Sequence, residues 1–295
     1  MNQLPENQGI LLPDAEKRHP PAGLTIAGFD PSSGAGITAD LKVFAAHGVY
    51  GMAAITALTV QSSLGVRRCE PVEAVLLAET LECLCADVRF AGIKIGMLGS
   101  AAATRTVSSF LAESGCALAG RSRVVLDPVL RSTSGRALLE SSGVSILRDQ
   151  LLANLGWITP NLEEIEVLTG MRPEGREGTA ASARRLQAMA AERGNPELNV
   201  VVTGGHLERP DDFLLTAAGE EIWFEGEHVA TSATHGTGCA FSTALLCALM
   251  AGDGAVAAVR SAKAYVTAAM KAAYPMGQGK GPMNHLFGFR SGPRG

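Results

Sequence analysis

Short apolar runs alternate with helix-forming stretches along most of the chain, and this alternation limits the folds open to it. Apolar runs typical of buried strands stand at 24–28, 53–60, 92–98, 123–126, 157–159 and 199–203. Stretches rich in helix formers lie between or after them at 37–47, 71–88, 101–113, 145–154, 162–169 and 179–192. Such an alternation predicts an α/β fold in three layers, with a mostly parallel central sheet and helices on both faces.

The last third of the chain does not continue this alternation of strands and helices. Two apolar runs at 212–216 and 221–225 flank a turn at Ala218-Gly219, which predicts a hairpin at the edge of the sheet. Helices are then expected at 239–250 and 255–273. A TIM barrel shares the β/α alternation, but the late hairpin and the helical finish fit it poorly.

The length of 295 residues and a hydrophobic content of 46% suit one large domain with a sizeable core. We expect this domain to span 23–289, because no low-complexity linker or internal repeat divides it. The proline-rich polar segment 1–22 is interpreted as a mobile tail, and 290–295 as a short C-terminal tail. A mobile loop is expected at 172–178.

Charge and hydropathy exclude several classes of protein. The net charge of −4 and the pI of about 5.9 argue against a nucleic-acid partner, which normally meets a basic face. No apolar run reaches the roughly 18 residues of a membrane span, and the N-terminus lacks a signal-peptide pattern. We therefore expect a cytoplasmic protein, with its six cysteines reduced.

Polar residues follow the ends of several predicted strands. They are Asp30, Gln61, Asp127, Asn161 and Thr203. Ligands bind at the carboxyl ends of the strands in open parallel sheets. These positions therefore predict a single cleft at one edge of the sheet.

The segment Thr234-His235-Gly236-Thr237-Gly238-Cys239 places two glycines before a predicted buried helix. Glycines let the backbone approach a ligand closely, and the first amides of a helix lack internal partners. Together with the helix dipole they form an anion site suited to phosphoryl transfer. Cys239 falls in the first turn, where we expect a lowered thiol pKa. The structural interpretation, a glycine turn before a buried small residue, is the weaker one here.

Two further segments leave structural and functional interpretations open. The loop 28–36 is rich in Gly and Ser, yet it lacks the spacing of a dinucleotide site and the Lys of a P-loop. Asp40, in the helix after it, can be a solvated helix residue. Lys94 lies in an apolar strand, where an unpaired ammonium is costly, so we expect it to pair with a carboxylate.

The polar residues Asp127, Asn161 and Glu164 also allow both a structural and a functional interpretation. Asp127 follows a strand, where a carboxylate can hold Mg²⁺ through water, but Asp127-Pro128 is also a common turn. Asn161 and Glu164 have the spacing of a helix N-cap with a capping box, which by itself explains both residues.

Taken together, the ordered motifs resemble the ribokinase-like superfamily and, within it, the bacterial hydroxymethylpyrimidine/phosphomethylpyrimidine kinases of thiamine biosynthesis. The resemblance runs from about residue 24 to 286. Its motifs include Ile26-Ala27-Gly28, Asp30-Pro31-Ser32, Gly34-Ala35-Gly36-Ile37, Ala39-Asp40-Leu41-Lys42, Lys94-Ile95-Gly96-Met97-Leu98, Leu126-Asp127-Pro128-Val129, Thr159-Pro160-Asn161, Gly204-Gly205-His206, His235-Gly236-Thr237-Gly238-Cys239 and Gly281-Pro282-Met283-Asn284-His285.

The resemblance implies a fold, a reaction and site residues. The fold would be a ribokinase-like sandwich, and the enzyme would use ATP and Mg²⁺ to phosphorylate 4-amino-5-hydroxymethyl-2-methylpyrimidine and then its monophosphate. It also implies a homodimer. The residues that it implies are Gly28, Asp40, Gln61 and Met97 for the pyrimidine, Asn161, Thr203 and Gly205 for ATP, Asp127 and Glu164 for the metal, and Gly236, Thr237, Gly238 and Cys239 for catalysis.

Two positions depart from the family pattern. Thr203 stands where many relatives carry a Lys that contacts the nucleotide phosphates, and Phe29 replaces a small residue near the pocket. Cys239 stands where the wider superfamily usually has an Asp base. Because the transition state of phosphoryl transfer is loose, a thiolate that takes the proton late can serve the first acceptor, an alcohol. The second acceptor is an anionic phosphate oxygen, so Cys239 is expected to matter less in the second step.

Two other functions stay open beside this one. A kinase for pyridoxal or a related pyridine alcohol would need a pocket that differs by only a few hydrogen bonds. The other alternative is a protein that binds a pyrimidine without catalysis. Such a protein would need neither metal ligands nor a base, so the presence of Asp127, Glu164 and Cys239 argues against it.

Overall fold

The computed structural model describes residues 19–113, 121–132, 135–204 and 209–289. The elements, in chain order, are β1 (Ala22–Phe29), α1 (Gly36–Ala46), β2 (Tyr50–Ser62), β3 (Gly65–Pro71), α2 (Ala74–Asp87), β4 (Gly92–Ile95), α3 (Ala101–Glu113), β5 (Val124–Leu126), α4 (Ser141–Asp149), β6 (Trp157–Ile158), α5 (Leu162–Thr169), α6 (Gly175–Ala191), β7 (Asn199–Val202), β8 (Asp212–Leu215), β9 (Glu221–Phe224), α7 (Thr237–Ala251) and α8 (Ala255–Lys271). Single 3₁₀ turns precede β5 and follow α4.

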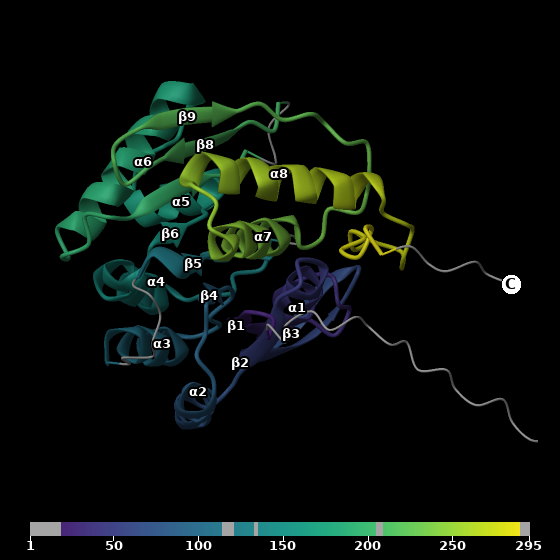
Figure 1. The fold of residues 1–295 in the computed structure, drawn as a ribbon, viewed down its shortest axis with the longest axis horizontal. Coiled ribbons are helices and arrows are strands. Elements are labelled where there is room, and N and C mark those ends of the chain that lie inside the picture. Colours follow the sequence, from purple (N-terminus) through teal and green to yellow (C-terminus); the bar gives the residue numbers. More distant parts are fainter. Residues whose placement is uncertain (1–18, 114–120, 133–134, 205–208, 290–295) are drawn as a thin grey trace, which may run out of the picture.

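The strands form one open sheet in the order β3-β2-β1-β4-β5-β6-β7-β8-β9 (Figure 1). The six central strands from β2 to β7 run parallel, while β3, β8 and β9 are antiparallel to their neighbours. The predicted edge hairpin is therefore confirmed as β8–β9. Because the sheet is open, with β3 and β9 at its edges, the TIM-barrel alternative is wrong.

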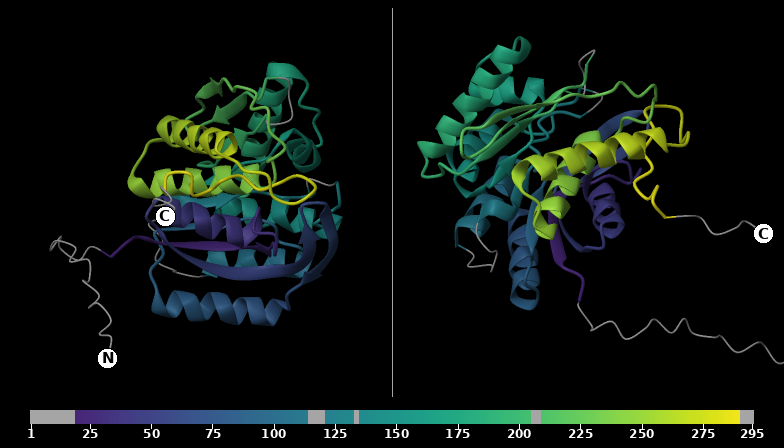
Figure 2. Two further views of the ribbon diagram at one scale, coloured as in Figure 1. Left: turned by 90° about the vertical axis from the view of Figure 1, so that its right-hand side faces the viewer. Right: turned by 45° about the horizontal axis from the view of Figure 1, so that its top comes forward.

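Two helical layers cover the sheet, as predicted (Figure 2). Helices α2 to α6 pack on one face, and α1, α7 and α8 pack on the other. Alternate side chains of a strand enter opposite layers. In β7, Val200 and Val202 join the core under α2 to α6, whereas Val201 joins the core under α1, α7 and α8.

Three details differ from the sequence-based expectation. Strand β3 has no counterpart among the predicted elements. Helix α6 begins at Gly175 and so takes in much of the predicted loop 172–178. Cys69, Cys83, Cys239 and Cys247 are free thiols, but Cys85 is disulfide-bonded, so the expectation of reduced cysteines is wrong at that position.

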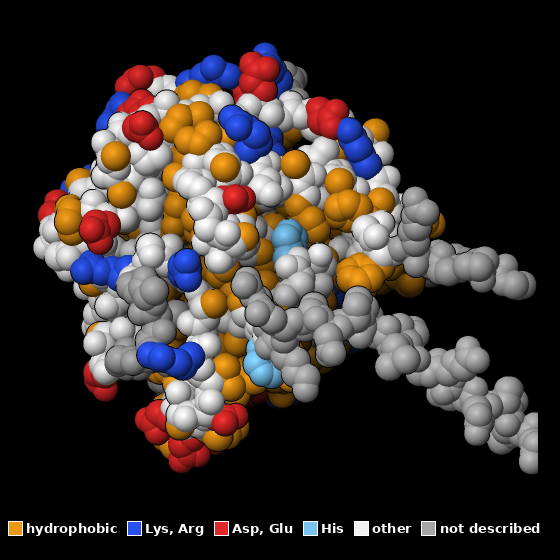
Figure 3. Space-filling model, viewed as in Figure 1, with side chains coloured by type: hydrophobic (Ala, Val, Ile, Leu, Met, Phe, Trp, Pro, Cys, Tyr) orange, Lys and Arg blue, Asp and Glu red, His pale blue; other side chains and the backbone are white. Residues whose placement is uncertain are grey.

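The boundaries and the surface add two observations. Strand β1 starts at Ala22, one residue before the expected domain start, while 1–18 and 290–295 lie outside the described residues. On the face drawn in Figure 3, Lys and Arg side chains lie among Asp and Glu side chains. No helix within the described ranges is long and apolar enough to cross a membrane.

The parallel strands end side by side, so the residues that follow them lie together at the carboxyl end of the sheet. Backbone hydrogen bonds continue the ladder beyond the strand ends, from Gly96 N to Ile26 O at 2.9 Å and from Asp127 N to Ile95 O at 2.8 Å. Further along the sheet, Thr203 N donates to Pro160 O at 2.9 Å. The cleft predicted from the polar strand ends therefore has its residues at one edge of the sheet.

Candidate active site

The loop between β1 and α1 is organised around the carboxylate of Asp30. Oδ1 accepts hydrogen bonds from Ser32 N at 2.8 Å and Ser32 Oγ at 2.7 Å, and Oδ2 accepts from Ala35 N at 2.9 Å and Gly34 N at 3.2 Å. His235 Nε2, from the loop before α7, lies 2.8 Å from the same Oδ2. Burial alone would raise the pKa of Asp30, but the bonds from His235 and Ser32 outweigh it and lower the pKa to about 2.

The loop before α7 packs directly against this first loop. Gly236 has a φ of 82°, and a Cβ there would lie 2.0 Å from Gly34 O. A Cβ on Gly34 would in turn lie 2.3 Å from His235 Cδ2. At Gly236 the two loops therefore touch backbone to backbone, which only glycine permits there, while a side chain at 34 would displace the His235 ring.

Helix α7 presents its N-terminus at this contact. Its first intrahelical hydrogen bond runs from Ala240 N to Gly236 O at 2.9 Å, so the amides of Thr237, Gly238 and Cys239 have no carbonyl one turn earlier to bond. The 15-residue helix adds its dipole to these amides. The geometry matches the predicted anion site at 236–238.

Cys239 is buried beneath this N-terminus, and its protonation differs from the expectation. Burial raises the pKa of the thiol to about 12, although the ammonium of Lys94 and the backbone N–H of Gly36 pull it down. The expected lowering of the pKa by the helix start is therefore wrong, because desolvation of a thiolate outweighs the dipole here. At neutral pH Cys239 is a thiol.

Lys94 and Asp40 form a fully buried ion pair, which confirms the expectation that Lys94 pairs with a carboxylate. Lys94 Nζ lies 2.9 Å from Asp40 Oδ2, and both side chains are 0% exposed. Burial opposes the ammonium, but the charges of Asp40 and its neighbours outweigh it and raise the pKa of Lys94. The pair is possible because Thr25 Oγ1 donates to Oδ2 at 2.6 Å and Thr243 Oγ1 donates to Oδ1 at 2.8 Å.

This arrangement defines the surroundings of Asp40. Its carboxylate accepts three hydrogen bonds from the protein and none of it reaches solvent. Asp40 therefore lies buried between α1, β1, β4 and α7, and its contact with the pyrimidine stays a prediction. The interpretation of Asp40 as a solvated helix residue is wrong for the same reason.

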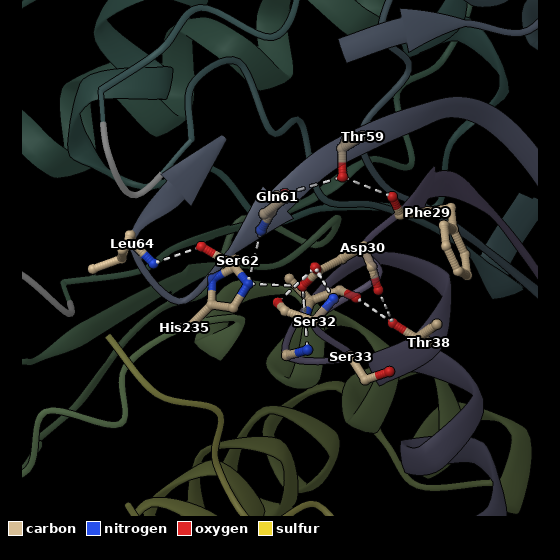
Figure 4. Close-up of polar contacts among 12 residues, drawn as sticks. Phe29, Asp30, Ser32, Ser33, Thr38, Thr59, Gln61, Ser62, Leu64 and His235 are labelled. Carbon is tan, nitrogen blue, oxygen red and sulfur yellow. Dashed lines mark hydrogen bonds and ion pairs between the residues drawn. The ribbon is translucent and has the colours of Figure 1, made fainter. Parts of the chain in front are cut away.

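The other predicted pyrimidine residues lie at the ends of β1, β2 and β4. A Cβ on Gly28 would lie 2.1 Å from Met97 Cε, so the missing side chain makes room for Met97. Gln61 is half-buried and reaches His235, with 3.0 Å between its Nε2 and the His Nε2. The ring of Phe29 points away from these contacts (Figure 4).

The carboxylates Asp127 and Glu164 both have raised pKa values, and the charge of Asp127 contributes to the shift of Glu164. Burial raises the pKa of Asp127 to about 6, against the opposing charge of Lys94. Burial and the charge of Asp127 raise the pKa of Glu164 to about 7. Asp127 Oδ2 is buried without a hydrogen-bond partner among the described residues, and it faces Gly238, where a Cβ would lie 3.3 Å away.

Glu164 also serves as the capping residue that the spacing predicts. Asn161 Oδ1 accepts from Glu164 N at 2.9 Å, and Glu164 Oε2 accepts from Asn161 N at 3.0 Å. Glu164 Oε1 accepts from Leu130 N at 3.1 Å. Asn161 pairs with Thr203 in an isolated bridge, so the two predicted ATP residues are neighbours, while Gly205 lies outside the described residues.

The sequence placed Asp30 among the polar strand ends of the predicted cleft, but it assigned neither Asp30 nor His235 a binding or catalytic role. Their interaction joins positions 205 residues apart, which no local pattern reports. The available signals were the Asp that ends a strand and the His that precedes a glycine loop.

Comparison with known proteins identifies the family. A family model described as phosphomethylpyrimidine kinase matches residues 30–284. The hydroxymethylpyrimidine/phosphomethylpyrimidine kinase of Haemophilus influenzae is 39% identical over 89% of this chain and 95% of its own length. The thiamine biosynthesis bifunctional protein ThiED of Geobacter sulfurreducens is 37% identical, and the match covers 89% of this chain and 52% of that protein.

Solved structures give the same fold. The ADP complex of Bacillus subtilis pyridoxal kinase superposes with a TM-score of 0.77 at 31% identity, and the match covers 90% of this chain and 97% of that one. The fold is thus the ribokinase-like sandwich that the motifs implied. With its family model, its relatives and its paired glycine loops in agreement, the chain belongs to the phosphomethylpyrimidine kinase family.

Proposed function

We propose that the protein transfers the γ-phosphoryl group of ATP to 4-amino-5-hydroxymethyl-2-methylpyrimidine and then to the monophosphate, in thiamine biosynthesis. Membership of the family and the relatives support this activity. The observation that carries it is the contact of two glycine loops around the N-terminus of α7, with a buried Cys239 below it. Such a site stabilises the charge that develops on a transferred phosphoryl group.

The substrate side of the site is formed by Gly28, Met97 and Gln61 in this proposal. With Lys94, Asp40 holds α1 and α7 against the sheet. The acceptor hydroxyl would approach Cys239, which is a neutral thiol before the substrates bind. A thiol can receive the alcohol proton only as its own proton passes to another base, for which an oxygen of the transferred phosphoryl group would serve, and a loose transition state requires this relay only late.

The nucleotide side is formed by Asn161 and Thr203 at the ends of β6 and β7. Asp127 and Glu164 have the chemistry that Mg²⁺ prefers, because both are buried carboxylates and Asp127 Oδ2 lacks a partner within the described part of the chain. Mg²⁺ would neutralise charge on the phosphates. The described residues contain no group of three His, Cys, Asp or Glu able to hold a metal alone. Water and phosphate oxygens would therefore complete its coordination.

The test is turnover of the pyrimidine alcohol with ATP and Mg²⁺, followed by mass spectrometry of the products. Appearance of the monophosphate and then the diphosphate is the expected result. Monophosphate alone would contradict the second step. Substrate binding without any product would contradict catalysis and favour a binding protein.

A pyridoxal-type kinase is the second candidate, because the fold superposes on a pyridoxal kinase at a TM-score of 0.77. The kcat/KM values for the pyrimidine and for pyridoxal, measured on one preparation, decide between the two. We also propose a homodimer and a cytoplasmic location, as the family resemblance implies. Analytical ultracentrifugation tests the dimer, since a single species of 30.6 kDa would exclude it.

A further inference from the structure

A line of polar contacts connects the first glycine loop to strand β2 (Figure 4). His235 Nε2 lies 2.8 Å from Asp30 Oδ2 and 3.0 Å from Gln61 Nε2. At the other end of the Gln61 amide, Oε1 lies 3.3 Å from Thr59 Oγ1. Thr59 Oγ1 lies 2.9 Å from the carbonyl oxygen of Phe29.

The contact with Asp30 decides which proton His235 carries. Asp30 accepts four hydrogen bonds from its own loop, from the N–H groups of residues 32, 34 and 35 and from the Ser32 hydroxyl, as an ionised carboxylate does. A carboxylate only accepts, so His235 Nε2 must bear a hydrogen and donate it to Oδ2. An amide nitrogen also only donates. With Gln61 Nε2 toward His235, two donors would therefore face each other at 3.0 Å.

The contact with Thr59 meets the same difficulty independently. A threonine hydroxyl has one hydrogen, and Thr59 spends it on the carbonyl oxygen of Phe29, which cannot donate in return. Thr59 Oγ1 therefore offers only lone pairs to Gln61. With Oε1 toward Thr59, two acceptors would face each other at 3.3 Å.

Both conflicts disappear when the Gln61 amide is rotated by 180° about its last side-chain bond. Oε1 then accepts from His235 Nε2–H, which it shares with Asp30, and Nε2 donates to Thr59 Oγ1. The oxygen and nitrogen of an amide have nearly the same shape, so their hydrogen-bond partners decide the orientation. We propose that His235 and Thr59 hold the Gln61 amide in this rotated orientation, and that this orientation selects aminopyrimidines over pyridine alcohols.

The substrate is selected by the hydrogen-bonding groups of the Gln61 amide that His235 and Thr59 do not use. This inference rests on the proposed pyrimidine kinase function. In the rotated orientation Oε1 still has one free lone pair, and Nε2 still has one free hydrogen to donate. A 4-aminopyrimidine carries a ring nitrogen that accepts beside an amine that donates, the pair that Gln and Asn read on adenine. Pyridoxal lacks this adjacent pair. A site whose polar groups stay unpaired with the wrong substrate discriminates against it.

Thr59→Val tests the selection, with Thr59→Ser as its matched control. Valine has the shape of threonine and suits the strand, but it removes the acceptor for Gln61 Nε2, whereas serine keeps the hydroxyl. We expect Thr59→Val to lower the ratio of kcat/KM for the pyrimidine over pyridoxal roughly fivefold, the size of one neutral hydrogen bond, mainly through the KM of the pyrimidine. Thr59→Ser should keep the wild-type ratio.

Nuclear Overhauser contacts of the Gln61 amide test the orientation without any turnover. The side-chain NH₂ signal can be assigned because it vanishes in Gln61→Glu. In the rotated orientation its protons lie close to the Thr59 side chain and away from the His235 ring. Strong contacts to the His235 ring instead would overturn the proposal.

The outcomes separate this proposal from the function on which it rests. An unchanged substrate ratio in a folded Thr59→Val protein, checked by its thermal unfolding, would overturn the selective role of the amide. Inhibition constants replace kcat/KM where pyridoxal is not phosphorylated. A wild-type protein that leaves the pyrimidine unphosphorylated would contradict the proposed function, while the amide contacts would still confirm or overturn the orientation.

Discussion

Two pairs of buried acids belong to different parts of the fold and differ in how fully their oxygens are hydrogen-bonded within the described residues, although the charges of Asp40 and Lys94 also act on Asp127. Asp30 and Asp40, on the side of β1 and α1, accept hydrogen bonds from backbone, hydroxyl, imidazole and ammonium groups. Asp127 and Glu164, on the side of β5 and α5, have raised pKa values, and Asp127 Oδ2 has no partner among the described residues.

The difference indicates that Asp30 and Asp40 belong to the scaffold, whereas Asp127 and Glu164 are placed to bind a ligand. The first pair is stabilised by the fold, so removing one of its partners should cost stability. In the second pair, Glu164 has both oxygens hydrogen-bonded, but Asp127 keeps one oxygen without a partner among the described residues, so a cationic ligand should stabilise Asp127 above all. A buried carboxylate with an unused oxygen therefore marks the place where metal and nucleotide would bind, while a saturated one marks the frame.

The largest effect is expected where the scaffold pair is broken. Lys94→Met should lower the free energy of unfolding by about 3–5 kcal/mol, because Asp40 is left buried without its counter-charge. Urea denaturation measures it. The matched control is the double variant Lys94→Met/Asp40→Leu, which should recover a large part of the loss. A single variant as stable as the wild type would contradict the scaffold role.

The opposite behaviour is expected on the ligand side. Asp127→Asn should lower kcat/KM roughly 100- to 1,000-fold, since a charge that helps to hold metal and phosphates is lost. Its stability without nucleotide should match or exceed that of the wild type, because a buried charge has gone. Steady-state kinetics and thermal unfolding, with and without Mg²⁺ and ATP, measure both. A strongly destabilised protein would place Asp127 in the scaffold instead.

Cys239 lies between the two pairs, and the two phosphorylation steps should separate its role. Cys239→Ala should slow the first step roughly 100-fold, as loss of a group that relays the acceptor proton does, and the second step less than tenfold. The second acceptor is an anionic phosphate oxygen and needs no base. Rapid-quench measurements of each step, the second started from the monophosphate, provide the test. Comparable losses in both steps would contradict this division.

The frame of the fold was predictable, because each central strand is an apolar run and each helix follows a turn. Strand β3 was not, since it is an exposed edge strand whose Arg67, Arg68 and Glu70 leave no apolar run to detect. It exists because β2 continues to Ser62, beyond its pairing with β1 that ends at Leu58, and offers β3 hydrogen-bonding partners there. Tertiary pairing decides such strands.

The family resemblance assigns residues to the site, but the sequence does not report their protonation. Motif order implied Asp127, Glu164 and Cys239. The thiol pKa depends on how much water the fold removes from Cys239. The position of Cys239 in the first turn of a helix does not contain this information. Likewise, Asp40 was assigned to the pocket wall, and only the positions of Thr25 and Thr243 reveal that its carboxylate is already fully bonded.

The smallest effect, and the sharpest test of the comparison, is the pH dependence of stability. Asp127 and Glu164 have folded pKa values of about 6 and about 7, above their ordinary values, so the folded state binds more protons and loses stability as the pH rises from about 4 to 7. Asp30 has a folded pKa of about 2, so its stabilising contribution is present above about pH 4 and is lost as the pH falls toward 2. Asp127→Asn should therefore flatten part of the decline between pH 4 and 7, and Asp30→Asn should leave that decline intact while lowering stability throughout it. Urea titrations at several pH values measure both variants, and Mg²⁺ with ATP should flatten the wild-type curve as Asp127→Asn does. A decline of undiminished size in Asp127→Asn and in the nucleotide complex would show that the two pairs of acids do not differ as the structure indicates.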